Sequence, residues 1–118
     1  MKIETIEGNK LIAKLDGKSK VHPNDLKYHS SYEWLMGVVE KVEETTIKIE
    51  KQWSLDGSEY SRFKVVIFNR CCDILVSNIV DDNIIEITAA KNKKEAIWLA
   101  LIQFYKWYEI NKNKAIGC

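Results

Sequence analysis

Apolar residues recur at helical spacing in three segments of the chain. The first segment is short, over residues 9–15, and ends at Asp16-Gly17. The second begins at Ser30-Ser31-Tyr32-Glu33, a capping box in which serine and glutamate oxygens accept hydrogen bonds from free amides of the first turn. The apolar face of this second helix then consists of Leu35, Val38, Val39 and Val42. These patterns predict two helices in the N-terminal half of the chain.

The third predicted helix covers residues 93–110, after the box-like start Asn92-Lys93-Lys94-Glu95. One apolar stripe follows helical spacing, and large apolar residues also occupy other faces of this helix. The stripe is Ile97, Ala100, Leu101, Phe104 and Tyr108, and the other residues are Trp98, Ile102, Tyr105 and Trp107. Such a helix either lies between the sheet and another layer or contributes to a subunit interface. The second arrangement predicts a homodimer that forms through this helix.

Four segments between the second and third helices have the pattern of strands. The segments cover residues 45–53, 63–68, 72–76 and 84–88, separated by turns at 55–58, 69–70 and 81–83. Apart from Lys64, the run over 63–68 is apolar at the positions that point to either face of a strand. We therefore expect both faces of this strand to be covered. The sequence therefore predicts an α+β protein, a single domain over 1–118, in the order α-α-β-β-β-β-α. Helices are expected to cover an antiparallel four-stranded meander.

Charge and composition narrow the setting of the protein. The 118 residues have a formal net charge of +1, which creates no field to draw the protein to nucleic acid or to an anionic membrane. We expect no signal peptide, and no segment approaches the about 20 apolar residues of a membrane span. Three cysteines, Cys71, Cys72 and Cys118, form no spaced pairs, which favours reduced thiols and a cytoplasmic location.

Residues able to carry out chemistry are few. Cys71 and Cys72 lack the spacing of zinc or redox pairs, and as neighbours on a strand they should point to opposite faces, one buried and one shallow. His22 and His29 have only Asp25 nearby, which is too few ligands for a metal site. The sequence therefore favours a protein that is not an enzyme and that has no catalytic residues, metal or cofactor.

Two charged groupings have structural explanations. Asp73 and Glu86 are expected to meet across strands, but a pair of carboxylates means little without a pocket. The last helix has an excess of lysines, which would suit a polyanion. Most of these lysines lie at the helix ends, where those at the C-terminal end complement the helix dipole. Nucleic-acid binding is therefore disfavoured.

The strongest candidate for a binding site is the cluster over residues 28–34. Free amides at a helix N-terminus hold anions, and aromatic rings beside them stack on planar ligands. The predicted ligand-binding residues are Tyr28, His29, Ser31, Tyr32, Arg62 and Arg70. The two arginines are suited to clamp a phosphate or a carboxylate. The alternative is that the aromatic residues form a lid over the core and the arginines form surface ion pairs.

Three segments carry a family resemblance: NKLIAKL, YHSSYEWLMGVVEKVE and KKEAIWLALIQFYKWYE. They resemble small proteins of tailed bacteriophages and prophages whose domain is called the phage ABA sandwich. The likeness spans nearly the whole chain and rests on packing residues. It implies helices over an antiparallel sheet and a phage accessory protein in the cytoplasm of the infected bacterial cell. Such a protein is expected to be a non-enzymatic binding module for a nucleotide-like signal or a host defence protein.

Two other functions stay open at this point. An enzyme of nucleotide or nucleic-acid metabolism would need two or more of His22, Asp25, His29 and Glu33 to converge on one pocket. A virion or assembly component is the second, and the sequence does not separate it from the others.

Overall fold

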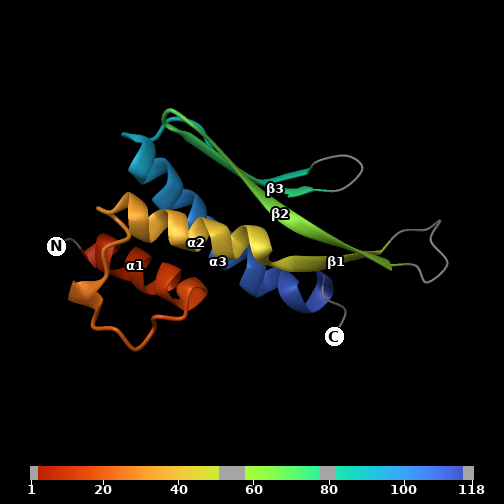
Figure 1. The fold of residues 1–118 in the computed structure, drawn as a ribbon, viewed down its shortest axis with the longest axis horizontal. Helices are drawn as coiled ribbons and strands as arrows, with labels where there is room; N and C mark the ends of the chain where they lie inside the picture. The colour runs from red at the N-terminus through yellow and green to blue at the C-terminus, as the bar shows by residue number, and fades with distance from the viewer. Residues whose placement is uncertain (1–2, 51–57, 78–81, 116–118) are drawn as a thin grey trace.

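The computed structural model describes residues 3–50, 58–77 and 82–115 (Figure 1), with side chains described over 3–46, 61–76 and 84–110. Its elements are α1 (Ile3–Asp16), the single 3-10 turn η1 (Pro23–Asp25), α2 (Tyr32–Glu44), β1 (Thr46–Glu50), β2 (Ser58–Phe68), β3 (Cys71–Ser77), β4 (Asp82–Ile87) and α3 (Lys93–Ala115). The predicted α+β class is confirmed.

Several elements are longer than the sequence pattern indicated, among them α3, which ends at Ala115 rather than at residue 110, and the starts of α1 and β2. α1 begins at Ile3 rather than at residue 9. Its first turns have few apolar residues, so they show little periodicity, and they are held by packing against the other helices. β2 begins at Ser58 rather than at residue 63, because its polar first half pairs with β1 from Glu50↔Ser58 to Thr46↔Arg62. Residues 51–53 of the predicted first strand lie outside the described residues.

The structure has three layers. The strands form an antiparallel sheet in the order β1-β2-β3-β4, so each strand pairs with the next along the chain. Helices α2 and α3 pack against the sheet, and α1 packs on α2 and α3 (Figure 1). Burial alternates along β3, where Cys72, Ile74 and Val76 are buried and their neighbours are more exposed. We call the covered side of the sheet the inner face and the other side the outer face.

Phe63 joins the sheet to α3 at the centre of the core. Its ring is fully enclosed on the inner face of β2 and meets Phe104 edge-to-face, with ring centroids 4.8 Å apart. Trp107 and Tyr108 contact the same ring at 5.7 and 6.4 Å. Edge-to-face pairs of this kind contribute about 0.5–1.5 kcal/mol each beyond the area that they bury. Phe104 therefore belongs to the core, and Trp107 and Tyr108 pack against it.

Two expectations about coverage are resolved by these contacts. α3 lies between α1 and the sheet, which is the first of the two arrangements expected for so apolar a helix. The expectation that both faces of 63–68 would be covered is wrong, because Val66 and Phe68 are 40% and 69% exposed. All the described helices that contact the sheet lie on its inner face, so none of them covers the outward-pointing residues of β2.

Gly8 sets how closely α1 approaches α3. It is buried, and a Cβ atom added there would lie 2.3 Å from Cζ2 of Trp98 and 2.7 Å from Cδ1 of Ile102. No side chain larger than hydrogen fits between the two helices at this point without moving Trp98. Gly37, in the middle of α2, has open space around its Cα.

Gly8→Ala and Gly37→Ala form a matched pair that tests this contact. Gly8→Ala should lower the free energy of unfolding by about 1–3 kcal/mol, because the indole of Trp98 must move. Gly37→Ala should raise it by about 0.5–1 kcal/mol, since alanine favours a helix and meets nothing. Urea unfolding followed by circular dichroism measures both. Equal effects of the two substitutions would contradict the close approach of α1 and α3.

Candidate functional site

Residues 28–34 connect the loop after η1 to the start of α2. Ser31 is the N-cap of α2, and its hydroxyl oxygen accepts a hydrogen bond from the amide of Trp34 at 3.3 Å. The predicted cap is therefore displaced by one residue, since a box starting at Ser30 would have used Glu33. Trp34 and His29 point to opposite sides of this connection, where each helps to line a separate hollow.

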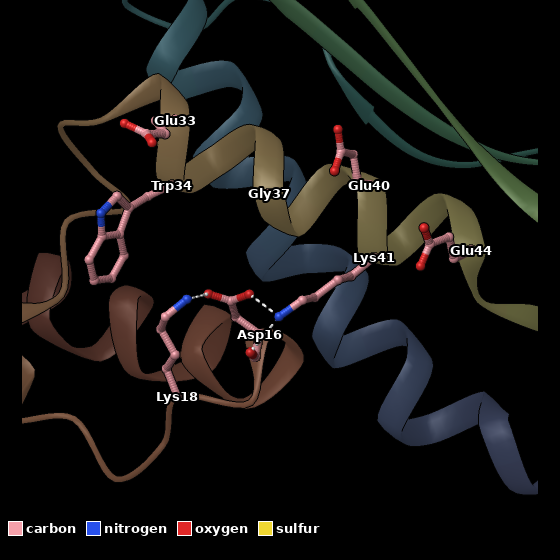
Figure 2. A pocket seen from close by; sticks show the side chains of 8 residues that line it. All are labelled: Asp16, Lys18, Glu33, Trp34, Gly37, Glu40, Lys41 and Glu44. Atoms are coloured by element: carbon pink, nitrogen blue, oxygen red, sulfur yellow. Dashed lines mark hydrogen bonds and ion pairs between the residues drawn. The ribbon is translucent and has the colours of Figure 1, made fainter.

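The first hollow, which we call the Trp34 hollow, has a volume of about 500 Å³ and lies between α2 and the end of α1 (Figure 2). Its lining residues are Asp16, Lys18, Glu33, Trp34, Gly37, Glu40, Lys41 and Glu44. Four carboxylates therefore face two ammonium groups, so the lining is negative at neutral pH. The residues on α2 follow helical spacing, which places one face of that helix along the hollow.

Asp16 is the buried acidic residue of the Trp34 hollow. α1 ends there because Gly17 turns the chain at a φ of 73°, and this turn brings Lys18 back toward the carboxylate. Nζ of Lys18 lies 2.9 Å from Oδ2 of Asp16, and Nζ of Lys41 lies 2.6 Å from Oδ1 (Figure 2). Lys41 also donates to the backbone carbonyl of Asp16 at 2.8 Å. These contacts fix the end of α1 against α2.

Tyr28 also binds the carboxylate of Asp16. Its hydroxyl donates a 2.6 Å hydrogen bond to Oδ2 of Asp16, and its ring is fully buried. Burial and the adjacent carboxylate raise the pKa of Tyr28 well above its ordinary value of 10.0. Burial would by itself raise the pKa of Asp16 also, but the hydrogen bonds from Lys41, Tyr28 and Lys18 outweigh it and lower the pKa below 3.8. Asp16 is therefore charged and Tyr28 is protonated at neutral pH.

The second hollow, which we call the His29 hollow, has a volume of about 350 Å³ and lies between the start of α1, the loop before α2 and the start of α3. Its lining residues are Thr5, His29, Ser30, Lys91, Asn92, Lys94, Glu95 and Trp98. They come from segments far apart in the sequence, which the α1–α3 contact brings together.

Asn9 fixes two of these lining residues from within the core. This fully buried residue receives a 2.9 Å hydrogen bond at Oδ1 from the indole Nε1 of Trp98. Its Nδ2 lies 2.9 Å from Nδ1 of His29 and donates to the carbonyl of Leu26 at 3.4 Å. Since an indole N–H only donates, the atom of Asn9 beside it must be the oxygen. The amide nitrogen therefore faces His29, whose Nδ1 accepts, so a neutral His29 has its proton on Nε2.

Basic groups dominate the rim of the His29 hollow. Lys94 extends over the ring of Tyr32, 5.4 Å from its centroid, and its Nζ lies 3.5 Å from the carbonyl oxygen of Ser30. The carboxylate of Glu95 accepts a hydrogen bond from the amide of Lys91 at 2.8 Å, and thereby helps to begin α3. Asn92 caps the same helix by accepting from the amide of Glu95 at 2.9 Å. With Lys91 and Lys94 against Glu95, this lining is net positive, and the N-terminal end of the α3 dipole adds to it.

The structure brings together only part of the predicted site. His29 lines the His29 hollow, Tyr32 lies beside it under Lys94, and Ser31 serves as the helix cap. Tyr28 instead lies in the core, as the lid interpretation expected, and offers a ligand no exposed atom of its ring. Its aromatic ring packs edge-to-face against Trp34, with centroids 5.1 Å apart.

Neither arginine is among the residues that line these two hollows. Arg62 is exposed on the outer face of β2, on the side of the sheet away from the helices. Arg70 lies in the turn between β2 and β3, where its carbonyl accepts a 3.2 Å hydrogen bond from the amide of Ala90. Lys94 and Trp98, which do line the His29 hollow, were not among the predicted site residues. Their i, i+4 spacing places them on one face of the last helix and could have indicated them.

The remaining candidates take structural positions. Nδ1 of His22 accepts from the amide of Asn24 at 3.2 Å, which caps η1. Cys72 is buried and Cys71 is half-buried, which confirms the alternation expected for neighbours on a strand. Burial, with a smaller effect of Asp73, raises the pKa of the Cys72 thiol to about 12. Within the described residues, no group of three His, Cys, Asp or Glu side chains is arranged to hold a metal ion.

Comparisons with known proteins returned no relative: no family model, curated protein or solved structure matches this chain. Over the part of the chain that the structure describes, none of the helices is long and apolar enough to cross a membrane.

Asp16→Asn tests the ion-pair network through its pH dependence. The lowered pKa of Asp16 means that its contribution to stability is complete above the ordinary value of 3.8 and is lost as the pH falls through the folded-state pKa. We expect the substitution to lower the free energy of unfolding by about 1–3 kcal/mol near neutral pH. The deficit should shrink toward pH 2, where the wild-type carboxylate is also protonated.

Urea unfolding at both pH values measures this difference. Glu40→Gln is the matched control, because Glu40 lines the same hollow but is exposed, and it should change stability by less than about 0.5 kcal/mol at either pH. A deficit for Asp16→Asn that is the same at both pH values would show that Asp16 is not held in its charged form.

Proposed function

We propose that this protein is a non-enzymatic binding module that takes an anionic, nucleotide-like ligand in the His29 hollow. The observation that carries the proposal is the Asn9 network. It fixes the imidazole of His29 and the indole of Trp98 in one hollow together with the ammonium groups of Lys91 and Lys94. A planar group and an anion are the two chemical features that such a lining recognises.

The two hollows differ in the net charge of their linings, which decides between them as sites for an anionic ligand. The Trp34 hollow is larger, but its carboxylates outnumber its ammonium groups, so it repels a phosphate. The two lysines there are already paired with Asp16. The His29 hollow has the opposite balance and includes the start of α3, where a helix dipole favours negative charge. An anionic ligand is therefore assigned to the His29 hollow.

The polar groups of the His29 hollow have complementary roles. Because Nδ1 of His29 accepts from Asn9, the remaining nitrogen of the neutral ring is a donor, which suits a phosphate or carbonyl oxygen. The indole N–H of Trp98 is bonded to Asn9, so its ring carbons are what a ligand meets. A volume of about 350 Å³ lies at the small end of ligand pockets, which run from about 300 to 1,000 Å³. Its size suits a mononucleotide rather than a polymer.

A binding role is preferred to catalysis because of where the candidate acid and base groups lie. His29 and Glu33 line different hollows, and neither His22 nor Asp25 lines the Trp34 hollow or the His29 hollow. General acid–base chemistry needs such groups within hydrogen-bond reach of one substrate.

The biological setting in this proposal comes from the sequence resemblance to phage proteins. On that basis the module acts in the cytoplasm of an infected bacterium, where the ligand is a nucleotide signal. A host defence protein that docks at the same rim is the alternative partner, and competition between it and a nucleotide would show that they share the site.

Calorimetric titration with inorganic phosphate, adenosine, AMP and ADP tests the ligand class. AMP or ADP should bind, and adenosine and phosphate should bind more weakly because each offers only one of the two features. Lys94→Ala should weaken nucleotide binding by about tenfold or more, since it removes a charge from the rim. Lys106→Ala is the control, because Lys106 is an exposed lysine of α3 outside the hollow, and it should bind as the wild type does.

Two results would contradict the proposal. The first is the absence of measurable heat with every compound at millimolar concentration. The second is binding that Lys94→Ala and Lys106→Ala weaken to the same extent.

A further inference from the structure

The outer face of the sheet leaves apolar residues exposed toward the end of β2. Phe68 and Val66 on β2 are 69% and 40% exposed. Leu75 on β3 lies on the same side of the sheet, opposite Lys64 and diagonal to Val66. None of the three contributes to the core, which ends at the inner face. Isolated apolar residues on a surface are common, but here Val66 adjoins Phe68 along β2 and adjoins Leu75 diagonally across the paired strands.

Charged residues of both signs lie on the same face, the basic residues on β2 and the acidic residues on β3 and β4. Lys64 and Arg62 lie on β2, next along the strand from Val66. Asp73 lies opposite Val66 in the register of β2 and β3, and Glu86 lies opposite Asp73 in the register of β3 and β4. One face therefore presents a basic strand beside an acidic row.

We propose that the outer face binds the outer face of a second copy of this chain, related by a two-fold axis that lies between the two sheets. Such an axis places the basic strand of one copy over the acidic row of the other, so that Lys64 meets the partner's Asp73 and Asp73 meets the partner's Lys64. Val66, Phe68 and Leu75 of both copies fill the layer between the sheets. A face that has both signs of charge in separate places is complementary to itself, as an interface between identical subunits requires.

The positions of these strands favour packing by faces. β2 and β3 are interior strands, so both of their edges are already paired within the sheet. An added strand from a partner has no free edge there, whereas side chains of two stacked sheets interdigitate at a spacing of about 10 Å. The dimer expected through the last helix would use a different surface, and Ile97, Ala100, Leu101 and Phe104 of the apolar stripe of that helix are buried inside this chain.

A charge-reversal experiment tests the proposed dimer. Analytical ultracentrifugation of the wild type should show a dimer at micromolar concentration. Lys64→Glu and Asp73→Lys should each weaken it by about tenfold or more, because each places like charges opposite one another twice in a symmetric pair. An equimolar mixture of the two variants should restore the dimer, since both contacts of the mixed pair then join opposite charges.

Phe68→Ser should also give a monomer, and circular dichroism of each variant should match the wild type, because the substituted side chains lie outside the core. The proposal is overturned if the wild type is monomeric up to about 100 µM, the concentration range of weak association. It is also overturned if the dimer survives each substitution, or if the mixture stays monomeric. The proposal is likewise overturned if the wild type is monomeric and binds a different protein through this face.

Discussion

The buried amide of Asn9 holds together the parts of this structure on which a binding role depends. Asn9 lies in α1, yet its hydrogen bonds reach Trp98 in α3, and His29 and Leu26 in the loop before α2. A buried amide that lost these partners would destabilise the fold by about 1–3 kcal/mol for each unsatisfied group. α1 therefore has one position against α3, and Gly8, one residue earlier, allows the close approach that this position requires. The His29 hollow exists because these two neighbouring residues hold α1 there.

Two polar networks, one around Asp16 and one around Asn9, each contact residues of the loop over 17–31. Asp16 joins the end of α1 to α2 through its ion pair with Lys41, and it also pairs with Lys18 and accepts a hydrogen bond from Tyr28, so both lysines of the Trp34 hollow are already paired. The Asn9 network uses only neutral groups and leaves the charges of Lys91 and Lys94 at the rim. A matched network contributes mainly to the fold, whereas charges at the rim of a hollow remain able to meet a ligand.

The sequence predicted those features that depend on local pattern. The apolar face of α2, the alternation of Cys71 and Cys72, and the class of fold all follow from spacing within a few residues. No local pattern predicts the Asn9–Trp98 hydrogen bond, because it joins residues 89 positions apart. The exposed outer face was also mispredicted, since an apolar run such as 63–68 has the same pattern whether its second face meets helices, another subunit or water.

The candidate site was also predicted only where it depends on local pattern. His29 and Tyr32 were found from the sequence because they flank a recognisable helix start, whereas Tyr28 in the same cluster is in the core. Their partners Lys94 and Trp98 come from α3, and only the packing of α1 against that helix brings them close. Aromatic residues beside a helix cap therefore indicate a region of interest, but burial decides which of them a ligand can touch.

The protonation of the His29 ring tests most directly whether Asn9 organises this site. Long-range proton–nitrogen NMR spectra of the ligand-free protein distinguish the two neutral forms of an imidazole. The structure predicts that neutral His29 has its proton on Nε2 and an unprotonated Nδ1, because Asn9 donates to Nδ1. A neutral ring with its proton on Nδ1, or an even mixture of both forms, would contradict this account.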